Sequence, residues 1–323
     1  MLIMIRKNIR AIASAAITVA FVAYIYINRH SIFGAFADIQ TVYLIPVIIG
    51  QLGIQLSNAA LLKTTTKPLK VHLSFFESFK LTMISSFVNF FTPVVGGAST
   101  RAVYLKREHD LAYSSFLGVI YSNYLIIFVV SFFTGLMALV SISGALSVSA
   151  GKIVAIFFAA GTVFSLLFML FGHLITNRLN QSDVKKPLIR KVSKKIALVD
   201  QGWSLIRRDR ITMLSMTACS IATTASVTIL YWGAMKSLGI NTGLNIALLY
   251  SALAIVGLLI NITPGSLGIR EAVYASIYTV TAIGAQQVVA FSLIDRMTQL
   301  ILLGIGWILF NRAILKGFSK KDF

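Results

Sequence analysis

Two similar stretches of the chain place proline and glycines next to an arginine, the side chain best suited to binding an anion. The first, FVNFFTPVVGGASTRAV, covers residues 87–103, and the second, LLINITPGSLGIREAV, covers residues 258–273. Proline and glycine interrupt helices, so each stretch predicts a break in an apolar helix. A guanidinium beside free backbone N–H groups favours phosphate or carboxylate. The pattern therefore predicts an anion site built from two breaks.

The residues expected to form this site fall into two groups. Those expected to bind the substrate are Arg101, Arg270, Arg296, Gly96, Gly97, Pro264, Gly265 and Gly268. Those expected to orient the arginines or to exchange protons are Glu271, Asp295, Asn89 and Asn261. Asp295 and Arg296 lie inside the last apolar segment, where each charge costs roughly 2.5–3.5 kcal/mol unless it meets a partner or a cavity. We expect the three arginines to converge on one anionic group.

Simpler interpretations of the same residues stay open. The two breaks are also typical of kinked membrane helices, Asp295 and Arg296 of a structural ion pair, and Arg101 of a loop cation. The Gly-x-Ser sequence at Ser99 resembles a serine nucleophile motif, but no base for it is evident. The four histidines have no metal-binding spacing, so neither a metal nor a cofactor is predicted.

The composition is that of a protein embedded in a membrane. Of 323 residues, 57% are hydrophobic and only 12% are charged, whereas soluble domains have roughly 25% charged residues. Apolar stretches of about 20 residues recur along the chain without alternation, which favours helices over a β-barrel. The net charge of +19 fits cytoplasmic loops that face anionic lipid headgroups, so nucleic acid is not an expected partner.

Basic residues set the expected orientation of the apolar segments. Spans are predicted at residues 9–28, 41–62, 113–139, 151–176, 211–237, 244–262 and 286–310. Lysines and arginines follow the second and fourth spans and fill the tail, whereas 140–150 carries no charge. The positive-inside rule then puts both termini in the cytoplasm of a multi-pass protein of the inner (plasma) membrane.

Two further apolar regions, 74–100 and 263–284, are too broken to be clean spans. The charge pattern requires the first to enter and leave on the cytoplasmic face, and the second is approached with the opposite polarity. Related breaks in opposite orientations are typical of an inverted repeat. We predict an all-α polytopic membrane protein, a helical bundle with two re-entrant broken-helix hairpins. The single domain 1–323 has a first half at about 1–176, a basic cytoplasmic connector at about 177–210 and a second half at about 211–323.

These motifs resemble those of a known family, the lysylphosphatidylglycerol synthase transmembrane-region family, whose members are also called flippase-like domain proteins. The resemblance rests on the stretch from Pro93 to Arg101, on the run from Thr263 to Glu271, and on Arg296 in the last span. It covers nearly the whole chain. At Ser266 the family commonly has glycine, which is a mild departure.

The resemblance implies a translocator of lipids with phosphate-bearing headgroups, such as an aminoacyl phospholipid or a polyprenyl-phosphate-linked sugar, in cell-envelope biogenesis. Its expected partner is a membrane lipid with an anionic headgroup, beside a glycosyltransferase or lipid synthase, and a homodimer is compatible with the sequence. Two rival functions stay open: an intramembrane enzyme acting on a lipid phosphate, with Glu271 or Asp295 as base, and a scaffold that does not transport. We expect a transporter and no enzyme, driven by ions, protons or the lipid gradient, because no nucleotide-binding motif is present.

Overall fold

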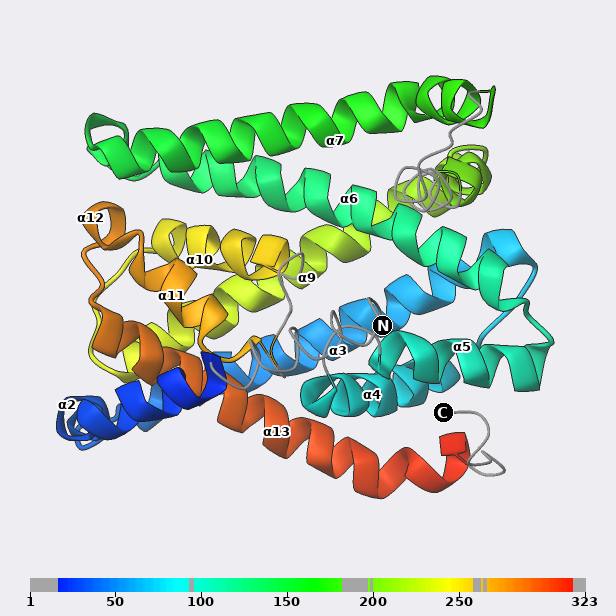
Figure 1. Ribbon diagram of the computed structural model, residues 1–323. Helices are drawn as coiled ribbons and strands as arrows, with labels where there is room; N and C mark the ends of the chain where they lie inside the picture. The colour runs from blue at the N-terminus through cyan, green and yellow to red at the C-terminus, as the bar shows by residue number, and fades with distance from the viewer. Residues whose placement is uncertain are drawn as a thin grey trace, which may run out of the picture.

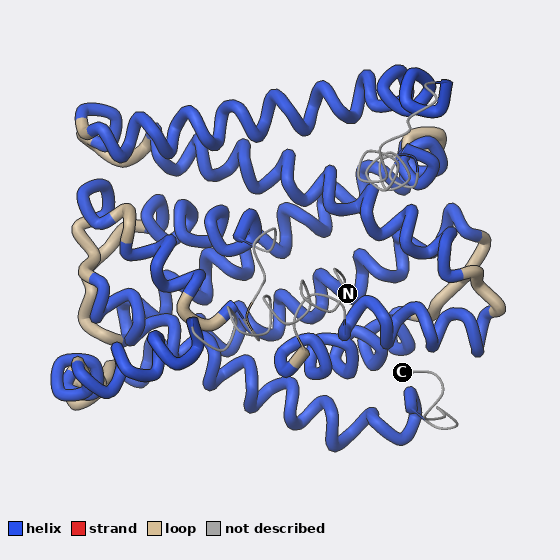
Figure 2. Tube along the Cα trace, viewed as in Figure 1, coloured by secondary structure: helices blue, strands red, loops and turns tan. Residues whose placement is uncertain are grey.

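The structure, a computed structural model, describes residues 17–92, 96–181, 197, 200–257, 263 and 266–315. Within these residues all regular structure is helical, as Figure 2 shows. Five helices are long and apolar enough to cross a membrane, and two shorter apolar helices lie at Ile17–Ile27 and Leu244–Val256. The predicted all-α polytopic membrane fold is therefore confirmed.

The helices differ in length, and the difference separates spans from hairpin arms. The long ones are α3 (Leu44–Thr66), α6 (Tyr113–Val140), α7 (Ser149–Gln181), α9 (Arg210–Ser237) and α13 (Ala285–Leu315). The shorter ones are α2 (Arg29–Gly34), α4 (Phe75–Phe91), α5 (Gly96–His109), α10 (Leu244–Val256), α11 (Ile269–Ala275) and α12 (Tyr278–Thr281). Single 3-10 turns lie at η1 (Thr41–Tyr43), η2 (Lys67–Leu69) and η3 (Ala145–Ser147).

The long helices run roughly from one end of the bundle to the other, whereas the two interrupted regions double back (Figure 1). Helix α4 runs from the right-hand end of the view to the middle, and α5 returns to the right. Helix α10 runs from the left-hand end to the middle, and α11 and α12 lead back to the left. We call these the first hairpin, α4 with α5, and the second hairpin, α10 with α11 and α12. Their insertion into a bilayer and an inverted repeat stay predictions.

Helix α10 covers the described part of the span predicted at 244–262, whose residues 258–262 lie outside the described residues. It begins as expected at Leu244, but its α-helix ends at Val256 and has 13 residues. At 1.5 Å per residue it covers about 20 Å, less than the roughly 30 Å of a hydrocarbon core. This helix therefore serves as one arm of the second hairpin.

Capping groups explain where two of the helices begin. The Ser74 hydroxyl accepts the Glu77 N–H at 3.1 Å, and the Glu77 carboxylate accepts the Ser74 N–H at 3.4 Å, which forms a capping box at the start of α4. At α9, Asp209 accepts the N–H groups of Ile211 and Thr212 at 3.0 and 3.2 Å. The hydrogen bond from the Thr212 hydroxyl, followed in size by that from the Thr212 main chain, lowers the pKa of Asp209 from its ordinary value.

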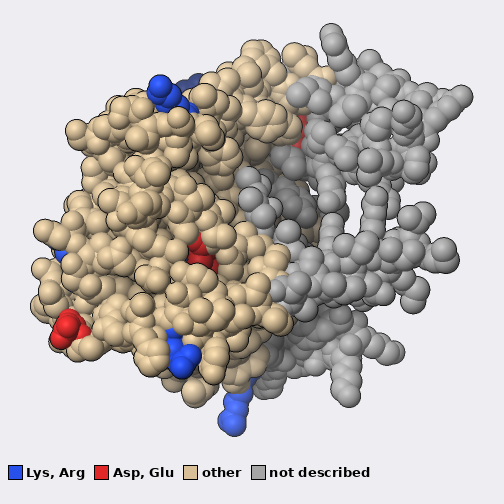
Figure 3. All heavy atoms as spheres, turned by 60° about the vertical axis from the view of Figure 1, so that its left-hand side comes forward, with Lys and Arg blue, Asp and Glu red and all other residues tan. Residues whose placement is uncertain are grey.

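The surface and the charge distribution fit a bundle surrounded by lipid. Helix α7 lies at the edge of the bundle, and only 11% of its most apolar 18-residue segment is buried inside the bundle. Large apolar side chains such as Ile156 and Phe164 are 68% and 69% exposed. The end of the bundle with the last turns of α3, α5 and α13 carries Lys63, Lys106 and Arg312. In Figure 3, the opposite end comes forward and its described surface is mostly uncharged. One end is therefore the more basic, as the positive-inside rule requires of the cytoplasmic side.

Candidate functional site

The second hairpin turns into α11 through left-handed backbone. Gly268 has a φ of 80° and Ser266 a φ of 56°, in the region that glycine adopts most easily. The main-chain N–H of Gly268 then donates to Glu271 Oε2 at 2.9 Å. This bond fixes the first turn of α11. Glycine at the position of Ser266 would adopt this backbone without steric cost.

Arg270 extends from this first turn toward helices α13 and α9. Its Nη1 lies 2.8 Å from Asp295 Oδ2, and its Nη2 donates to Ser292 Oγ at 3.0 Å. A longer bond of 3.4 Å joins Nη1 to the Tyr231 hydroxyl. The guanidinium thus already has a carboxylate partner.

Glu271 occupies the centre of the cluster. Its Oε1 accepts Arg296 Nη2 at 2.7 Å and the Ser292 hydroxyl, and it lies 3.7 Å from Arg270 Nε. Glu271, Asp295 and Arg296 are 4%, 5% and 7% exposed, so the cluster is buried. Two guanidinium groups face two carboxylates, and this neutral balance is what permits burial of four charges.

Helix α3 joins the cluster through Gln51. Its Nε2 donates to Asp295 Oδ1 at 2.7 Å and to the Asp295 main-chain oxygen at 3.1 Å. The Tyr231 hydroxyl, which contacts Arg270, also lies 3.0 Å from the Tyr274 hydroxyl. We call the group Gln51, Tyr231, Arg270, Glu271, Ser292, Asp295 and Arg296 the charge cluster; it ties α3, α9, α11 and α13 together.

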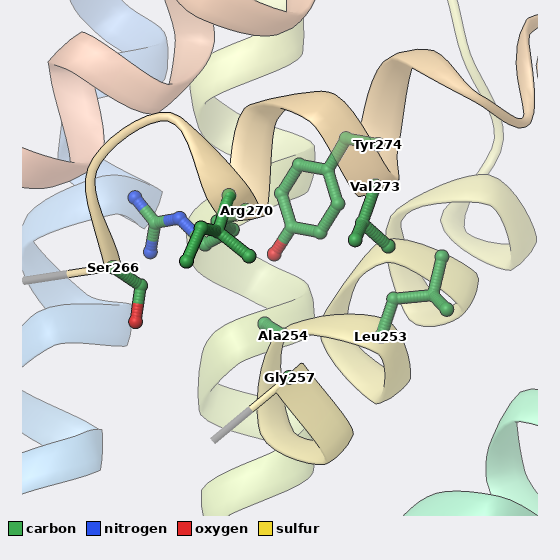
Figure 4. A pocket seen from close by; sticks show the side chains of 8 residues that line it. Leu253, Ala254, Gly257, Ser266, Arg270, Val273 and Tyr274 are labelled. Carbon is green, nitrogen blue, oxygen red and sulfur yellow. The ribbon is translucent and has the colours of Figure 1, made fainter. Parts of the chain in front are cut away.

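The space beside Arg270 is small. A cavity of about 20 Å³ lies between α10 and α11, lined by Leu253, Ala254, Gly257, Ser266, Ile269, Arg270, Val273 and Tyr274. Figure 4 shows Arg270 and Tyr274 projecting from α11, with Leu253 and Gly257 facing them from α10. This volume suits about one water molecule. The described residues therefore leave little open space beside Arg270.

Arg101 has different surroundings. It lies on α5, is half-buried, and donates through Nε to Ser85 Oγ on α4 at 2.8 Å. Among the described residues, no carboxylate forms an ion pair with it. The structure therefore brings Arg270 and Arg296 together, as expected, but it shows no bond between Arg101 and the charge cluster.

Gly96 and Gly97 allow α5 to approach α4 closely. A Cβ atom at Gly97 would lie 2.5 Å from the Ser85 carbonyl oxygen and 3.0 Å from Asn89 Cβ. One at Gly96 would lie 1.7 Å from Thr92 Oγ1. The glycines expected to bind substrate therefore have a packing role, which sets the position of Arg101 against Ser85.

The remaining predicted residues lie apart from the charge cluster or outside the described part of the chain. Asn89 is exposed near the end of α4. Among the residues named in the two motifs, Pro93, Asn261, Pro264 and Gly265 lie outside the described residues. Thr263 is described and buried, and its hydroxyl donates to the Leu267 carbonyl at 2.9 Å.

A comparison with protein families agrees with these motifs and with the helical bundle. The family described as "Lysylphosphatidylglycerol synthase TM region" matches residues 11–306. The chain belongs to this family. No curated protein and no solved structure matches it. For this member of the lysylphosphatidylglycerol synthase TM family, the broken motifs and the buried charges therefore lie within the shared region.

Sequence reasoning missed several residues of the charge cluster. Ser292 is three residues before Asp295 and four before Arg296, so helical spacing could have placed it on their face. Tyr231 and Gln51 come from α9 and α3, far away in the sequence. Nothing in their local sequence indicates these contacts, because only the packing of the bundle creates them.

Proposed function

We propose that this family member translocates a lipid with a phosphate-bearing headgroup between the leaflets of the plasma membrane, without changing the lipid chemically. In this proposal Arg101 holds the phosphate, and the acyl or prenyl tail stays in the bilayer. An aminoacyl phospholipid and a polyprenyl-phosphate-linked sugar both have the required anion. The more basic end of the bundle would face the cytoplasm, with both chain termini on that side.

The observation that carries this proposal is the lack of a carboxylate partner for Arg101 among the described residues. Arginine stays charged under all conditions, and a charge within a membrane bundle is unfavourable unless it meets a partner. The Ser85 hydroxyl supplies one neutral hydrogen bond and leaves the charge uncompensated. A phosphate would compensate it and could bind both Nη groups. Helix α5 starts at Gly96, five residues before Arg101, and its N-terminal dipole adds to the positive potential.

The charge cluster supports a second role in the same proposal. Asp295 and Glu271 already neutralise Arg270 and Arg296, and the neighbouring cavity is about 20 Å³. For the headgroup to reach Arg270, the second hairpin would have to open and Asp295 would have to release the Arg270 guanidinium. We propose that this exchange moves the headgroup from the first hairpin to the second.

A transport assay tests the proposal. The chain is reconstituted in vesicles with a tail-labelled phosphatidylglycerol, and the loss of label from the outer leaflet is followed with a membrane-impermeant quencher. We expect label movement without chemical change, and Arg101→Ala should slow it by at least tenfold. Arg107→Ala is the matched control, because Arg107 lies on the same helix and pairs with Glu108 at 2.5 Å outside the proposed site; it should move lipid at the wild-type rate.

Other outcomes would separate the rival functions. Chemical conversion of the lipid would indicate an intramembrane enzyme. Neither movement nor conversion would leave a scaffold for a glycosyltransferase or lipid synthase. Equal transport by wild type and Arg101→Ala would reject Arg101 as the phosphate ligand.

A further inference from the structure

Helix α3 carries two glutamines whose side-chain carbonyl oxygens are buried without a hydrogen bond. Gln51 and Gln55 are 2% and 1% exposed, and neither Oε1 atom has a partner among the described residues. Leaving a buried acceptor unsatisfied is unfavourable, so native structures seldom do it without a reason. Because the two residues are four apart on one helix, their side chains lie on the same face, about one turn apart.

Helix α3 packs against α13, which carries part of the charge cluster, and against α4, which carries Ser85. Gln51 donates to Asp295, which in turn holds Arg270. Gln55 lies about one helical turn beyond Gln51, toward the end of α3 that leads into α4, the helix whose Ser85 holds Arg101.

We propose that Gln51 and Gln55 bind the part of the headgroup beyond the phosphate, through an O–H or N–H donor of that group. This inference rests on the proposed translocation and specifies its substrate. Arg101 is a pure donor and suits the phosphate, whereas the two free carbonyl oxygens are pure acceptors and suit a hydroxyl or an ammonium group. The substrate is therefore a phosphodiester lipid whose headgroup carries hydrogen-bond donors.

Matched lipids test this directly in phosphatidylcholine vesicles that contain the full chain. Tail-labelled phosphatidylglycerol is compared with tail-labelled phosphatidylmethanol, which has the same charge but no hydroxyl. Tail-labelled phosphatidylethanolamine is compared with tail-labelled phosphatidylcholine, whose ammonium has no N–H. We expect the donor-bearing lipid of at least one pair to move about fivefold to tenfold faster, as the loss of one hydrogen bond to a buried acceptor predicts. The pair that shows the preference identifies the donor as hydroxyl or ammonium.

The variant Gln55→Leu should remove the preference by slowing only the donor-bearing lipid. Ser131→Ala is the control, because Ser131 on α6 also has a buried hydroxyl without a hydrogen bond but belongs to neither arginine site; it should retain the preference. If Gln55→Leu does not fold, Gln55→Met takes its place.

Three results would overturn the inference. Equal rates within both lipid pairs would show that water alone satisfies the glutamines. A preference that survives in the Gln55 variant would assign selectivity to other residues. A Gln55 variant that slows all four lipids equally would give the glutamine a structural role only. By contrast, a wild-type chain that moves no lipid would reject the proposed translocation itself, and this inference with it.

Discussion

The two hairpins carry arginines at corresponding places in similar motifs, yet their electrostatic surroundings differ. In the second hairpin, Arg270 lies 2.8 Å from Asp295, and Glu271 accepts a hydrogen bond from Arg296 at 2.7 Å. In the first hairpin, Arg101 bonds to the neutral Ser85, and no described carboxylate pairs with it. The same residue type therefore fulfils a structural need in one hairpin and leaves a charge uncompensated in the other.

This difference shows that a repeated motif does not imply a repeated role. Glu271 follows Arg270 directly, whereas alanine follows Arg101, so only the second motif brings its own carboxylate. A buried neutral cluster holds helices in place, and an uncompensated guanidinium is available for an external anion. Substitutions of the charged residues should accordingly have different effects: those in the charge cluster should lower stability as well as transport, whereas those of Arg101 should lower transport alone.

The largest expected effect on stability comes from Glu271→Leu. This change removes the carboxylate that Arg296 contacts and the acceptor for the Gly268 N–H. Breaking a buried ion pair from one side costs about 3–5 kcal/mol, so thermal unfolding in detergent should occur at a clearly lower temperature. Arg101→Ala should unfold close to the wild-type temperature.

The variant Glu271→Gln sharpens this test, because an amide oxygen can still accept hydrogen bonds but has no charge. Its unfolding temperature should lie between those of the wild type and Glu271→Leu. If Arg101→Ala destabilised the protein as much as Glu271→Leu, the contrast between the two hairpins would be wrong.

An intermediate effect is expected for Gly97→Ala in the first hairpin. The added Cβ would lie 2.5 Å from the main-chain oxygen of Ser85, so α4 and α5 must separate. Such overpacking lowers the free energy of unfolding by about 1–3 kcal/mol. It should also slow transport, because the Ser85 contact with Arg101 would change.

Gly96→Ala is the comparison for this change. Its added Cβ would lie 1.7 and 2.8 Å from Oγ1 and Cβ of Thr92, the C-cap residue of α4, which can shift more easily than the main chain of Ser85 inside the helix, so the loss should be smaller. Thermal unfolding and lipid movement of both variants check this order. The reverse order would show that the closeness of the two helices does not set the position of Arg101.

The smallest effect is expected for Ser266→Gly in the second hairpin. Ser266 adopts a φ of 56°, which glycine adopts without steric cost. Glycine should therefore stabilise the turn by up to about 1 kcal/mol, reduced by the greater entropy of the unfolded chain. A rise in unfolding temperature would support the left-handed turn. A fall would indicate that the contacts of the serine hydroxyl stabilise the turn by more than the relief of backbone strain.

Much of the fold could be predicted because hydrocarbon solvent leaves few choices for the backbone. The helices α6 at 113–140 and α9 at 210–237 agree with predictions at 113–139 and 211–237 to within one residue. Helix α10 begins at Leu244 as predicted, and the last part of the span predicted at 244–262 lies outside the described residues. The site was predicted in part: Arg270, Glu271, Asp295 and Arg296 form one cluster, but Arg101 is not bonded to it.

The sequence by itself determined that the chain is a helical membrane bundle, where its helices break, and which charges must find partners inside. It could do so because burial of apolar residues and the energetic penalty for a lone charge in hydrocarbon depend on residue type alone. Only the tertiary structure decided which charge received which partner. Gln51, Tyr231 and Ser292 reach the cluster from separate helices, and a distance between side chains on packed helices is set by the whole bundle and by no local sequence.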